Sequence, residues 1–384
     1  MQKWDGLQRL NMSKIKKKNI TILSSFAPSL TIFRGDMIAA FIRNGYKVTC
    51  FSPEGQHVNA FNELRSIGVE TYLYSLERTG TGILADLKTL IGLAKIFRKI
   101  SNSFVISYTA KPVLYGSMIS LFFPNITHLA MITGMPSILH RLSHYSLSRF
   151  VVKEVMRGNS KILFQNSDDE QFFAQNRYLH AGQSVRINGS GINLEKYKYY
   201  PPSSIAPVSF LLISRLLYQK GILEYIEAAN QVSKTFSQAS FSIVGWFDTG
   251  NPDGISQVDF FSLIKNSKVE YLGKHLDVRH VIRNHSVYVL PSYHEGMPRT
   301  VLEAMAIGRP IITTDVPGCR DTVEEGVNGF LVPQGESEAI AESMMRFINS
   351  PELIKPMGEA SREFAERKYD VNLVNKKILA VLKS

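Results

Sequence analysis

The sequence predicts an α/β protein in which parallel strands alternate with helices. Short apolar runs that are typical of buried strands, for example residues 19–24 and 287–291, recur along the chain and are separated by helical segments. This alternation is typical of open parallel sheets. With 384 residues the chain is long for one domain and comfortable for two. The Pro- and Ser-containing segment at residues 199–204 has the composition of a linker between them.

The first half of the chain begins with a polar, basic segment, residues 1–18, which has no apolar core and is expected to be a leader rather than a signal peptide. Gly35, just before the first expected helix, would let a ligand phosphate approach, and an ordinary turn glycine is an equally good interpretation. Ser167 is a suitable N-cap for a helix whose first turn is acidic. We expect strands at residues 19–24, 46–51, 69–74, 104–108 and 161–166, a strand followed by a loop at 128–134, and a loop at 26–35. We expect helices at 36–44, 86–100, 113–123 and 141–157.

The second half repeats the alternating pattern. A long loop at residues 246–256 interrupts it, and Gly308 is a natural helix stop. We expect strands at residues 208–214, 240–245, 269–273, 287–291 and 310–314, and helices that start near residues 222, 277, 298 and 372.

Two acidic residues lie near the start of one of these helices, one in the loop before it and one within it. Glu295 lies in the loop after the strand at 287–291, and Glu303 lies within the helix that Pro298 is suited to begin. The helix start exposes backbone N–H groups, which suit a phosphate, while a carboxylate accepts hydrogen bonds from sugar hydroxyls. The sequence therefore favours a site for a sugar attached to a phosphate. The alternative is that both are ordinary surface charges. The site would include Gly296, Met297, Pro298 and Thr300.

Two cations stand at the end of another expected strand. Arg215 and Lys220 are five residues apart, just before a helix start at about residue 222. Two such cations can hold one diphosphate from two sides, and the helix start adds to the positive potential. The alternative is a solvated loop.

The charge of the chain is unevenly distributed. The net charge is +11; residues 1–190 hold 23 Lys and Arg against 11 Asp and Glu, whereas residues 191–384 hold 21 against 22. The basic half is therefore expected to meet a lipid headgroup, a diphosphate or a nucleic acid.

The sequence contains no motif for several other kinds of site. The two cysteines, Cys50 and Cys319, are far apart, which indicates a reducing compartment rather than a disulfide framework. No Cys/His cluster has zinc spacing, and no G-x-G-x-x-G, G-x-x-x-x-G-K-[ST] or G-x-S-x-G motif is present. The aromatic and basic residues do not interleave as in RNA-binding domains, so no nucleic-acid partner is expected.

The segment from Ser292 to Pro310 resembles the Glu-x7-Glu signature of the retaining glycosyltransferases of family four, and residues 314–318 and 328–333 extend the resemblance. The resemblance implies the GT-B fold, in which two doubly wound Rossmann-like domains face each other across a cleft. Residues 19–200 would form the N-terminal domain, which faces the acceptor and the membrane. Residues 201–369 would bind a nucleotide sugar, and the helix at 370–384 would pack back on the first domain.

The resemblance also implies roles for individual residues. Glu295 would contact the donor sugar, Glu303 the ribose, and Arg215 and Lys220 the diphosphate. The loop of Gly273 and His275 would hold the nucleobase through backbone groups. Residues 107–116 and 131–134 resemble the acceptor-facing loops, with Tyr108, Lys111, Thr133 and Gly134 as candidates. Many members carry a His near position 108 that touches the donor sugar, so Tyr108 is a departure from the family pattern.

The activity that follows from the resemblance is transfer of a sugar, expected to be an N-acetylhexosamine, from a UDP-sugar to a lipid-linked glycan with retention of configuration. Details at residues 33–35, 111–112 and 245–251 are similar to bacterial enzymes of polyprenyl-diphosphate-linked glycan or lipopolysaccharide assembly. No metal or other cofactor is expected. The expected place is the cytoplasm, at the inner face of the bacterial plasma membrane, held to its anionic surface; the oligomeric state is not indicated.

Two alternatives remain at this stage. A UDP-sugar epimerase shares the same fold, and a non-catalytic binder of nucleotide sugars or nucleic acids would need no acceptor. Acceptor-dependent release of UDP distinguishes the transferase from both.

Overall fold

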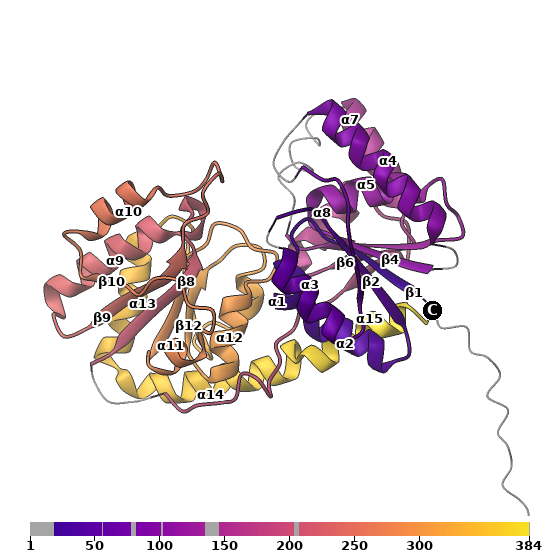
Figure 1. Cartoon of the computed structure of the whole chain (residues 1–384). Coiled ribbons are helices and arrows are strands. Elements are labelled where there is room, and N and C mark those ends of the chain that lie inside the picture. Colours follow the sequence, from indigo (N-terminus) through magenta and orange to yellow (C-terminus); the bar gives the residue numbers. More distant parts are fainter. Residues whose placement is uncertain are drawn as a thin grey trace, which may run out of the picture.

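The computed structural model describes residues 19–55, 57–77, 82–100, 103–134, 146–202 and 207–383, without the side chains of residues 83 and 146–149. The expected leader at 1–18 and the first five residues of the expected helix at 141–157 lie outside the described residues. Two α/β domains stand next to each other, and the C-terminal helices run from the second domain back to the first (Figure 1).

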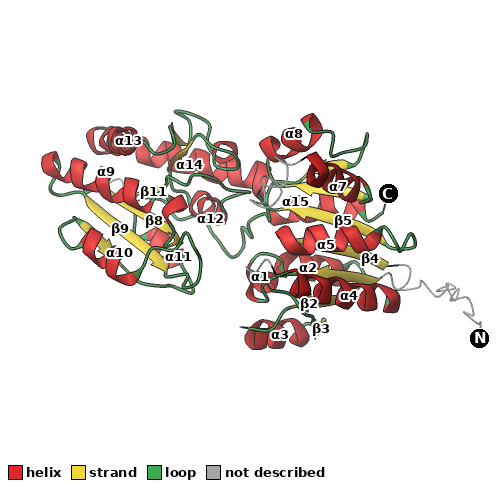
Figure 2. Ribbon diagram, turned by 90° about the horizontal axis from the view of Figure 1, so that it is seen from above, coloured by secondary structure: helices red, strands yellow, loops and turns green. Residues whose placement is uncertain are grey.

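The first domain is built on a parallel sheet of seven strands in the order β3-β2-β1-β4-β5-β6-β7. Consecutive residues of β4 point to opposite faces, so that Val105 and Ile106 belong to two different apolar clusters. Helices cover both faces of the sheet (Figure 2). The elements are β1 (Asn19–Leu23), α1 (Pro28–Ile32), α2 (Gly35–Arg43), β2 (Lys47–Ser52), α3 (His57–Ser66), β3 (Glu70–Leu73), α4 (Ile83–Lys99), β4 (Ser103–Tyr108), α5 (Ala110–Ser120), β5 (Thr127–Ile132), α7 (Ser146–Arg157), β6 (Lys161–Phe164), α8 (Ser167–Gln175) and β7 (Ser184–Arg186).

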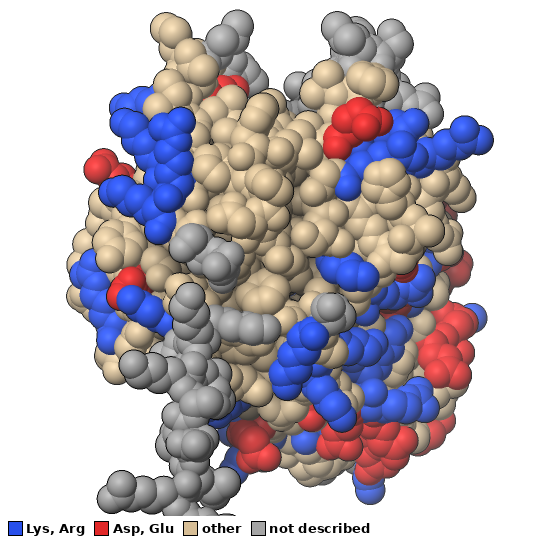
Figure 3. Space-filling view, turned by 90° about the vertical axis from the view of Figure 1, so that its right-hand side faces the viewer, with Lys and Arg blue, Asp and Glu red and all other residues tan. Residues whose placement is uncertain are grey.

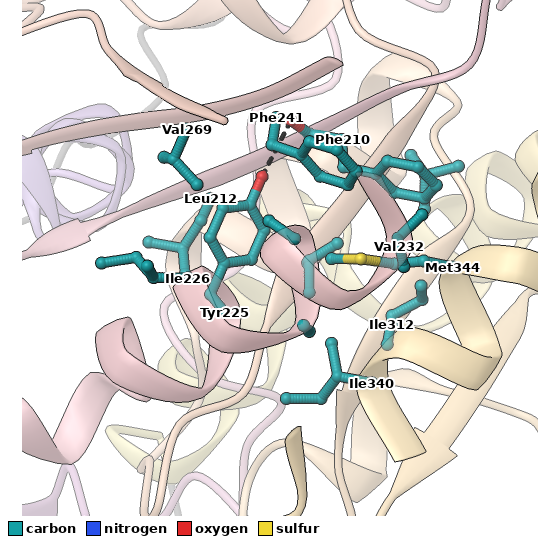
Figure 4. Packing of buried hydrophobic residues seen from close by; sticks show 14 of the residues in the cluster. Phe210, Leu212, Tyr225, Ile226, Val232, Phe241, Val269, Ile312, Ile340 and Met344 are labelled. Atoms are coloured by element: carbon teal, nitrogen blue, oxygen red, sulfur yellow. Dashed lines mark hydrogen bonds between the residues drawn. The ribbon is translucent and has the colours of Figure 1, made fainter. Parts of the chain in front are cut away.

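The second domain has a parallel sheet of six strands in the order β10-β9-β8-β11-β12-β13. Figure 4 shows the apolar cluster on one of its faces, in which the buried Tyr225 hydroxyl donates to the carbonyl oxygens of Phe210 (3.0 Å) and Ser242 (3.2 Å). The elements are β8 (Ser209–Arg215), η1 (Tyr218–Lys220), α9 (Ile222–Thr235), β9 (Ser240–Trp246), α10 (Gln257–Ile264), β10 (Val269–Tyr271), α11 (Arg279–Arg283), β11 (Val287–Leu290), α12 (Arg299–Ile307), β12 (Ile311–Thr314), η2 (Arg320–Thr322), β13 (Gly329–Val332), α13 (Ser337–Asn349), η3 (Pro351–Leu353), α14 (Ile354–Phe364), the π-helical turn η4 (Ala365–Tyr369) and α15 (Val371–Val381).

Both sheets are doubly wound, and each has one point at which the strand order reverses. In the first sheet this point lies between β1 and β4, and in the second it lies between β8 and β11. In open parallel sheets ligands bind at the carboxyl ends of the strands that flank such a point. The residues that follow β1, β4, β8 and β11 are therefore the ones to inspect for a site.

The chain passes between the domains twice, once near residue 192 and once near residues 369–371. These two passages are hydrogen-bonded to each other. The N–H of Ile192 donates to Tyr369 O (2.7 Å), and the N–H of Val371 donates to Ile192 O (3.0 Å). Gly191 has a φ of +70°, and a Cβ there would lie 2.6 Å from Val371 Cα, so both its conformation and the close approach require glycine.

The last helix, α15, belongs to the core of the first domain. Val374, Ile378 and Leu382 are buried in the same apolar cluster as Phe41 of α2. Asn375 Nδ2 also donates to the Asp36 carbonyl oxygen (3.2 Å). The C-terminal segment thus fastens the second domain to the first.

Three local expectations from the sequence need correction. The segment at 26–35 contains helix α1, because Pro28 stands at its first position and Ser24 and Ser29 bind the Phe26 carbonyl. The N-cap of α8 is Asn166, not Ser167, since the Asn166 side chain accepts from the Asp169 N–H (2.8 Å). Helix α5 starts at Ala110, so that Pro112 lies in its first turn, where no intrahelical N–H is needed.

Helix α4 also differs from the expectation. Leu87, Leu90, Ile91, Ala94 and Phe97 are expected on its packed face. Phe97 is buried and Leu90 packs partly against the same core, but Leu87 and Ile91 are exposed. The apolar residues of this helix cover more than one face, and only one of these faces meets the sheet. None of the described helices has the length and apolar character that a membrane-spanning segment needs.

Candidate functional site

The reversal point of the second sheet brings the two predicted cations together with a predicted carboxylate. Arg215 ends β8, and Lys220 ends the 3-10 turn η1 that follows it. Gly221, with a φ of +71°, allows this turn to pack closely against the end of β11, because a Cβ there would lie 2.1 Å from the Pro291 carbonyl oxygen. The loops after β8 and β11 are therefore in direct contact.

Each of these cations already has a carboxylate partner. Lys220 Nζ lies 2.5 Å from Glu295 Oε1, and the two side chains are only 13% and 17% exposed. Arg215 Nη1 donates to Asp248 Oδ2 (2.8 Å) in the loop after β9. A negatively charged ligand that enters here competes with Glu295 and Asp248 for the two cations.

Glu303 is buried inside α12 and takes part in a separate cluster. Its Oε1 accepts from the Tyr197 hydroxyl (2.8 Å) and from Arg299 Nε (3.3 Å). Burial raises the pKa of Glu303, and the charge of Arg299 opposes this shift. Two donors thus hold the Glu303 side chain in place: Arg299, one turn earlier on the same helix, and Tyr197, from a segment that is distant in sequence.

The helix that carries Glu303 begins one residue later than expected. Pro298 is the N-cap, Arg299 is the first helical residue, and Gly308 ends the helix with a φ of +92°. Met297 packs partly against the apolar cluster beneath α12. Gly296 and Pro298 are buried, and Thr300 lies half-buried in the first turn.

The loop expected to hold a nucleobase follows β10. The carbonyl of Gly273 accepts from the Gly245 N–H (3.0 Å), and His275 Nε2 is 3.1 Å from the Leu272 carbonyl oxygen. Farther along, Arg279 Nη1 donates to the carbonyl of Lys196 (3.2 Å). Because Tyr197 comes next and binds Glu303, this loop and the Glu303 cluster share one network.

The first domain directly contacts the loop that carries Glu295 and Gly296. A Cβ on Gly296 would lie 2.2 Å from the Thr133 carbonyl oxygen, and a Cβ on Gly134 would lie 3.1 Å from Gly296 N. Asn166 Nδ2 donates to Gly296 O (2.8 Å). The structure thus brings the predicted residues Thr133 and Gly134 together with Gly296.

The other predicted residues of the first domain are less accessible. Tyr108 is 2% exposed, and its hydroxyl is hydrogen-bonded to Ser24 (3.0 Å) and Ser29 (2.8 Å). Lys111 Nζ forms an ion pair with Asp86 of α4 (3.0 Å). Gly35 begins α2, and a Cβ there would meet no atom within 4 Å, so the space in front of this helix start is open.

The comparisons with known proteins agree with this architecture. Residues 206–364 match the family described as glycosyl transferases group 1. The chain is 25% identical over 377 residues to the Campylobacter jejuni N,N'-diacetylbacillosaminyl-diphospho-undecaprenol alpha-1,3-N-acetylgalactosaminyltransferase, covering 94% of this chain and 97% of that protein. It is 24% identical over 376 residues to the Staphylococcus aureus capsular polysaccharide biosynthesis glycosyltransferase CapM, covering 94% and 95%.

Among solved structures, Anabaena Alr3699/HepE in complex with UDP and glucose superimposes with a TM-score of 0.76 at 20% identity, over 95% of this chain and 99% of that one. This likeness extends over both domains. Residues 206–364 thus match a group 1 glycosyl transferase domain, and the chain has the GT-B fold.

Sequence reasoning missed several residues of this site. Asp248, Tyr197 and Asn166 lie in no motif, and each binds a partner that is distant in sequence. Arg299 lies within the Glu-x7-Glu segment, four residues before its partner Glu303, but was given no role. The one available signal was that Asp248 follows a strand end in a long loop. Among the described residues no group of His, Cys, Asp and Glu has the arrangement of a metal site.

The contact between Gly296 and Thr133 leads to a testable prediction about how the two domains are held together. The φ of Gly296 lies outside the left-handed region, so the effect of Gly296→Ala is purely steric. The added methyl group cannot fit against the Thr133 carbonyl, so the domains separate locally, and the free energy of unfolding falls by about 1–3 kcal/mol. Small-angle X-ray scattering should show a larger radius of gyration, and urea unfolding a lower midpoint.

Gly92→Ala on α4 is the matched control, because a Cβ at Gly92 meets no atom within 4 Å and alanine favours a helix. Its radius of gyration should equal that of the unchanged protein. A wild-type radius and midpoint for Gly296→Ala would show that the domains are not held together at this contact.

Proposed function

We propose that this glycosyltransferase transfers a sugar, an N-acetylhexosamine, from a UDP-sugar to a glycan carried on a polyprenyl diphosphate, with retention of configuration. The observation that carries the proposal is the partly buried Lys220–Glu295 pair at the reversal point of the second sheet, where Arg215 ends the neighbouring strand β8. The relatives support it, since one is named for an undecaprenyl-diphosphate-linked substrate and one fold neighbour is solved with UDP and glucose.

In the proposed reaction the bond between the anomeric carbon and the donor's phosphate oxygen breaks, and a bond to the acceptor hydroxyl oxygen forms on the same face. The acceptor's proton passes to the leaving phosphate oxygen, so no side chain is assigned as base. Negative charge grows on the departing diphosphate, where Lys220 and Arg215 stabilise it after exchanging their carboxylate partners for phosphate oxygens. Because these cations stabilise the leaving group, the proposal includes no metal.

The two glutamates have different proposed partners. Glu295 accepts hydrogen bonds from hydroxyls of the donor sugar, and its position beside Lys220 places the sugar next to the diphosphate. Glu303 accepts from the ribose; Tyr197 and Arg299, the first residue of α12, hold its carboxylate in place.

The matched substitutions Glu303→Gln and Glu295→Gln distinguish these roles. Glu303→Gln replaces a charged acceptor by a neutral one and should weaken UDP binding by about 1 kcal/mol. Glu295→Gln should leave UDP binding unchanged or make it tighter, since it frees Lys220 for the phosphate, while transfer slows strongly. Calorimetry with UDP alone and a transfer assay measure the two effects; the opposite ranking would mean that the two roles are exchanged.

Lys220→Ala tests the leaving-group assignment. Loss of one preorganised charge contact should lower turnover by roughly a hundredfold or more. Lys234→Ala removes an exposed cation from the other end of α9 and should leave turnover unchanged. A folded Lys220→Ala protein with normal kinetics would refute the diphosphate assignment.

The acceptor side includes a proposed membrane surface on α4. Leu84, Leu87 and Ile91 are exposed, with Leu84 at 83%, and they line a surface depression of about 350 Å³ together with Lys88 and Lys95. Leucine and lysine on one exposed helix face suit insertion among anionic headgroups. Figure 3 shows the side of the first domain that lies at the right of Figure 1, where Lys and Arg side chains stand in groups around a broad uncharged area.

Membrane binding should depend on these charges and on salt. Replacing Lys95, Arg98 and Lys99 by Gln should weaken binding to phosphatidylglycerol vesicles by up to about a hundredfold at low salt, since each cation contributes about 1 kcal/mol. High salt should weaken binding of the unchanged protein, because the Debye length shortens. Co-sedimentation at two salt concentrations is the measurement.

The control is a triple Gln variant at Lys234, Lys265 and Lys355, which are exposed on the second domain and should matter little. Replacing Leu87 and Ile91 by Ser should remove the part of the binding that survives high salt. If the protein stays in the supernatant at low salt, or binds neutral vesicles equally well, the basic surface has another purpose.

A further inference from the structure

The reversal point of the first sheet holds a cation that the proposed mechanism does not yet use. Arg34 stands between α1 and α2, just before Gly35, and its side chain is 3% exposed. Its guanidinium carbon lies 4.9 Å from the centre of the Tyr108 ring at the end of β4. The Tyr108 hydroxyl is tied to Ser24 and Ser29, so the ring forms a fixed platform beneath Arg34.

Among the residues that the structure describes, Arg34 differs from the other cations of the site in having no carboxylate partner. Lys220 is paired with Glu295, Arg215 with Asp248, and Arg299 with Glu303. Within the described part of the chain no ion pair includes Arg34, and its Nε is buried without a hydrogen-bond partner. Burial lowers the pKa of Arg34 to about 10, so the side chain is still charged at neutral pH.

A buried cation without a partner is not explained by stability. Removing a charge from water is costly, and stacking on an aromatic ring recovers only part of that cost. Such a group persists where an anion that is absent from the free protein later compensates it.

The position of Arg34 indicates which anion this is. Arg299, the first residue of α12, is close enough for its positive charge to add to the lowering of the pKa of Arg34. Figure 1 shows α1 on the side of the first domain that faces α12. The start of α2 faces open space at Gly35, where backbone N–H groups are available. Because the three carboxylate pairs are each neutral, Arg34 supplies the excess positive charge of this set of side chains.

We propose that Arg34 binds the diphosphate of the sugar donor from the side of the first domain, opposite Lys220 and Arg215. The inference rests on the proposed function and adds a residue to it. Tyr108, at the position where many family members have a histidine, then acts as a positioning residue that supports Arg34. The ligand joins the two domains, because each contributes cations to the same diphosphate.

Calorimetric titration of UDP, uridine and pyrophosphate tests the proposal. Arg34→Met should raise the Kd of UDP about tenfold to a hundredfold, the range for a lost charged hydrogen bond, and should weaken pyrophosphate similarly. The Kd of uridine, which has no phosphate, should not change. Arg34→Lys should restore part of the affinity. Arg43→Met, at the exposed end of the same helix α2, is the control and should bind like the unchanged protein.

Thermal unfolding separates binding from a structural role. Without ligand, Arg34→Met should melt at the same temperature as the unchanged protein or higher, since a buried unpaired charge is removed. A lower melting temperature with an unchanged Kd for UDP would overturn the proposal and make Arg34 structural. An unchanged Kd for UDP with a raised KM for a polyprenyl-diphosphate acceptor would also overturn it, in favour of the acceptor's phosphates.

GDP distinguishes failure of this inference from failure of the proposed function. If the protein binds UDP and GDP equally and both depend on Arg34, the diphosphate role stands and the UDP-sugar donor is wrong. If UDP binds selectively and Arg34→Met changes nothing, the donor stands and the role of Arg34 is wrong.

Discussion

The two passages of the chain between the domains bind each other, and the position of every cleft residue depends on this pairing. Ile192 exchanges backbone hydrogen bonds with Tyr369 and Val371, and Gly191 lets the passages come into contact. Beyond this point α15 is buried in the core of the first domain. The two reversal points are therefore held facing each other by backbone contacts and by a helix that contributes to the other domain's core. Side-chain contacts such as Arg320 with Asp168 (2.7 Å) add to this.

Most cations at the cleft are paired with carboxylates, so the cleft of the free protein is nearly neutral. The same cations can still bind an anion. Partly buried pairs such as Lys220 with Glu295 avoid the high cost of burying single charges. A phosphate that replaces a carboxylate as partner meets a cation that is already in place, so little reorganisation is needed during reaction. Arg34 differs from these paired cations. In its proposed role, the missing partner lowers the stability of the free protein and raises its affinity for an anion.

The first domain combines this cleft with a surface of different character on α4. The exposed leucines and the lysines beside them lie on the helix face turned away from the sheet, whereas Leu93 and Phe97 are buried. In the proposed function, the acceptor keeps its lipid carrier in the membrane while its sugar reaches the cleft. An apolar and basic helix face on the same domain as residues 131–134 would then keep the membrane and the cleft at a fixed distance.

The sequence by itself determined the alternation of strands and helices and the two domains, and it singled out the proposed donor residues. Glu295 and Glu303 could be grouped because one strand, loop and helix of continuous chain carry them, so local patterns fix their relative placement. Arg215 and Lys220 could be grouped for the same reason. All four follow the end of a strand by a short stretch of chain, whatever the rest of the chain does.

Only the tertiary structure decided the partners and the buried faces. Asp248 binds Arg215 across 33 residues, Tyr197 binds Glu303 across 106, and Asn166 reaches Gly296 across 130. Helix α4 has apolar residues on more than one face, so periodicity did not show which face meets the sheet. Whether a cation such as Arg34 is paired depends on which carboxylates the packing of both domains brings within a few ångströms. Which carboxylates come near Arg34 depends on how the cores of both domains pack and on how the two chain passages between the domains pair. Neither can be read from a local sequence pattern.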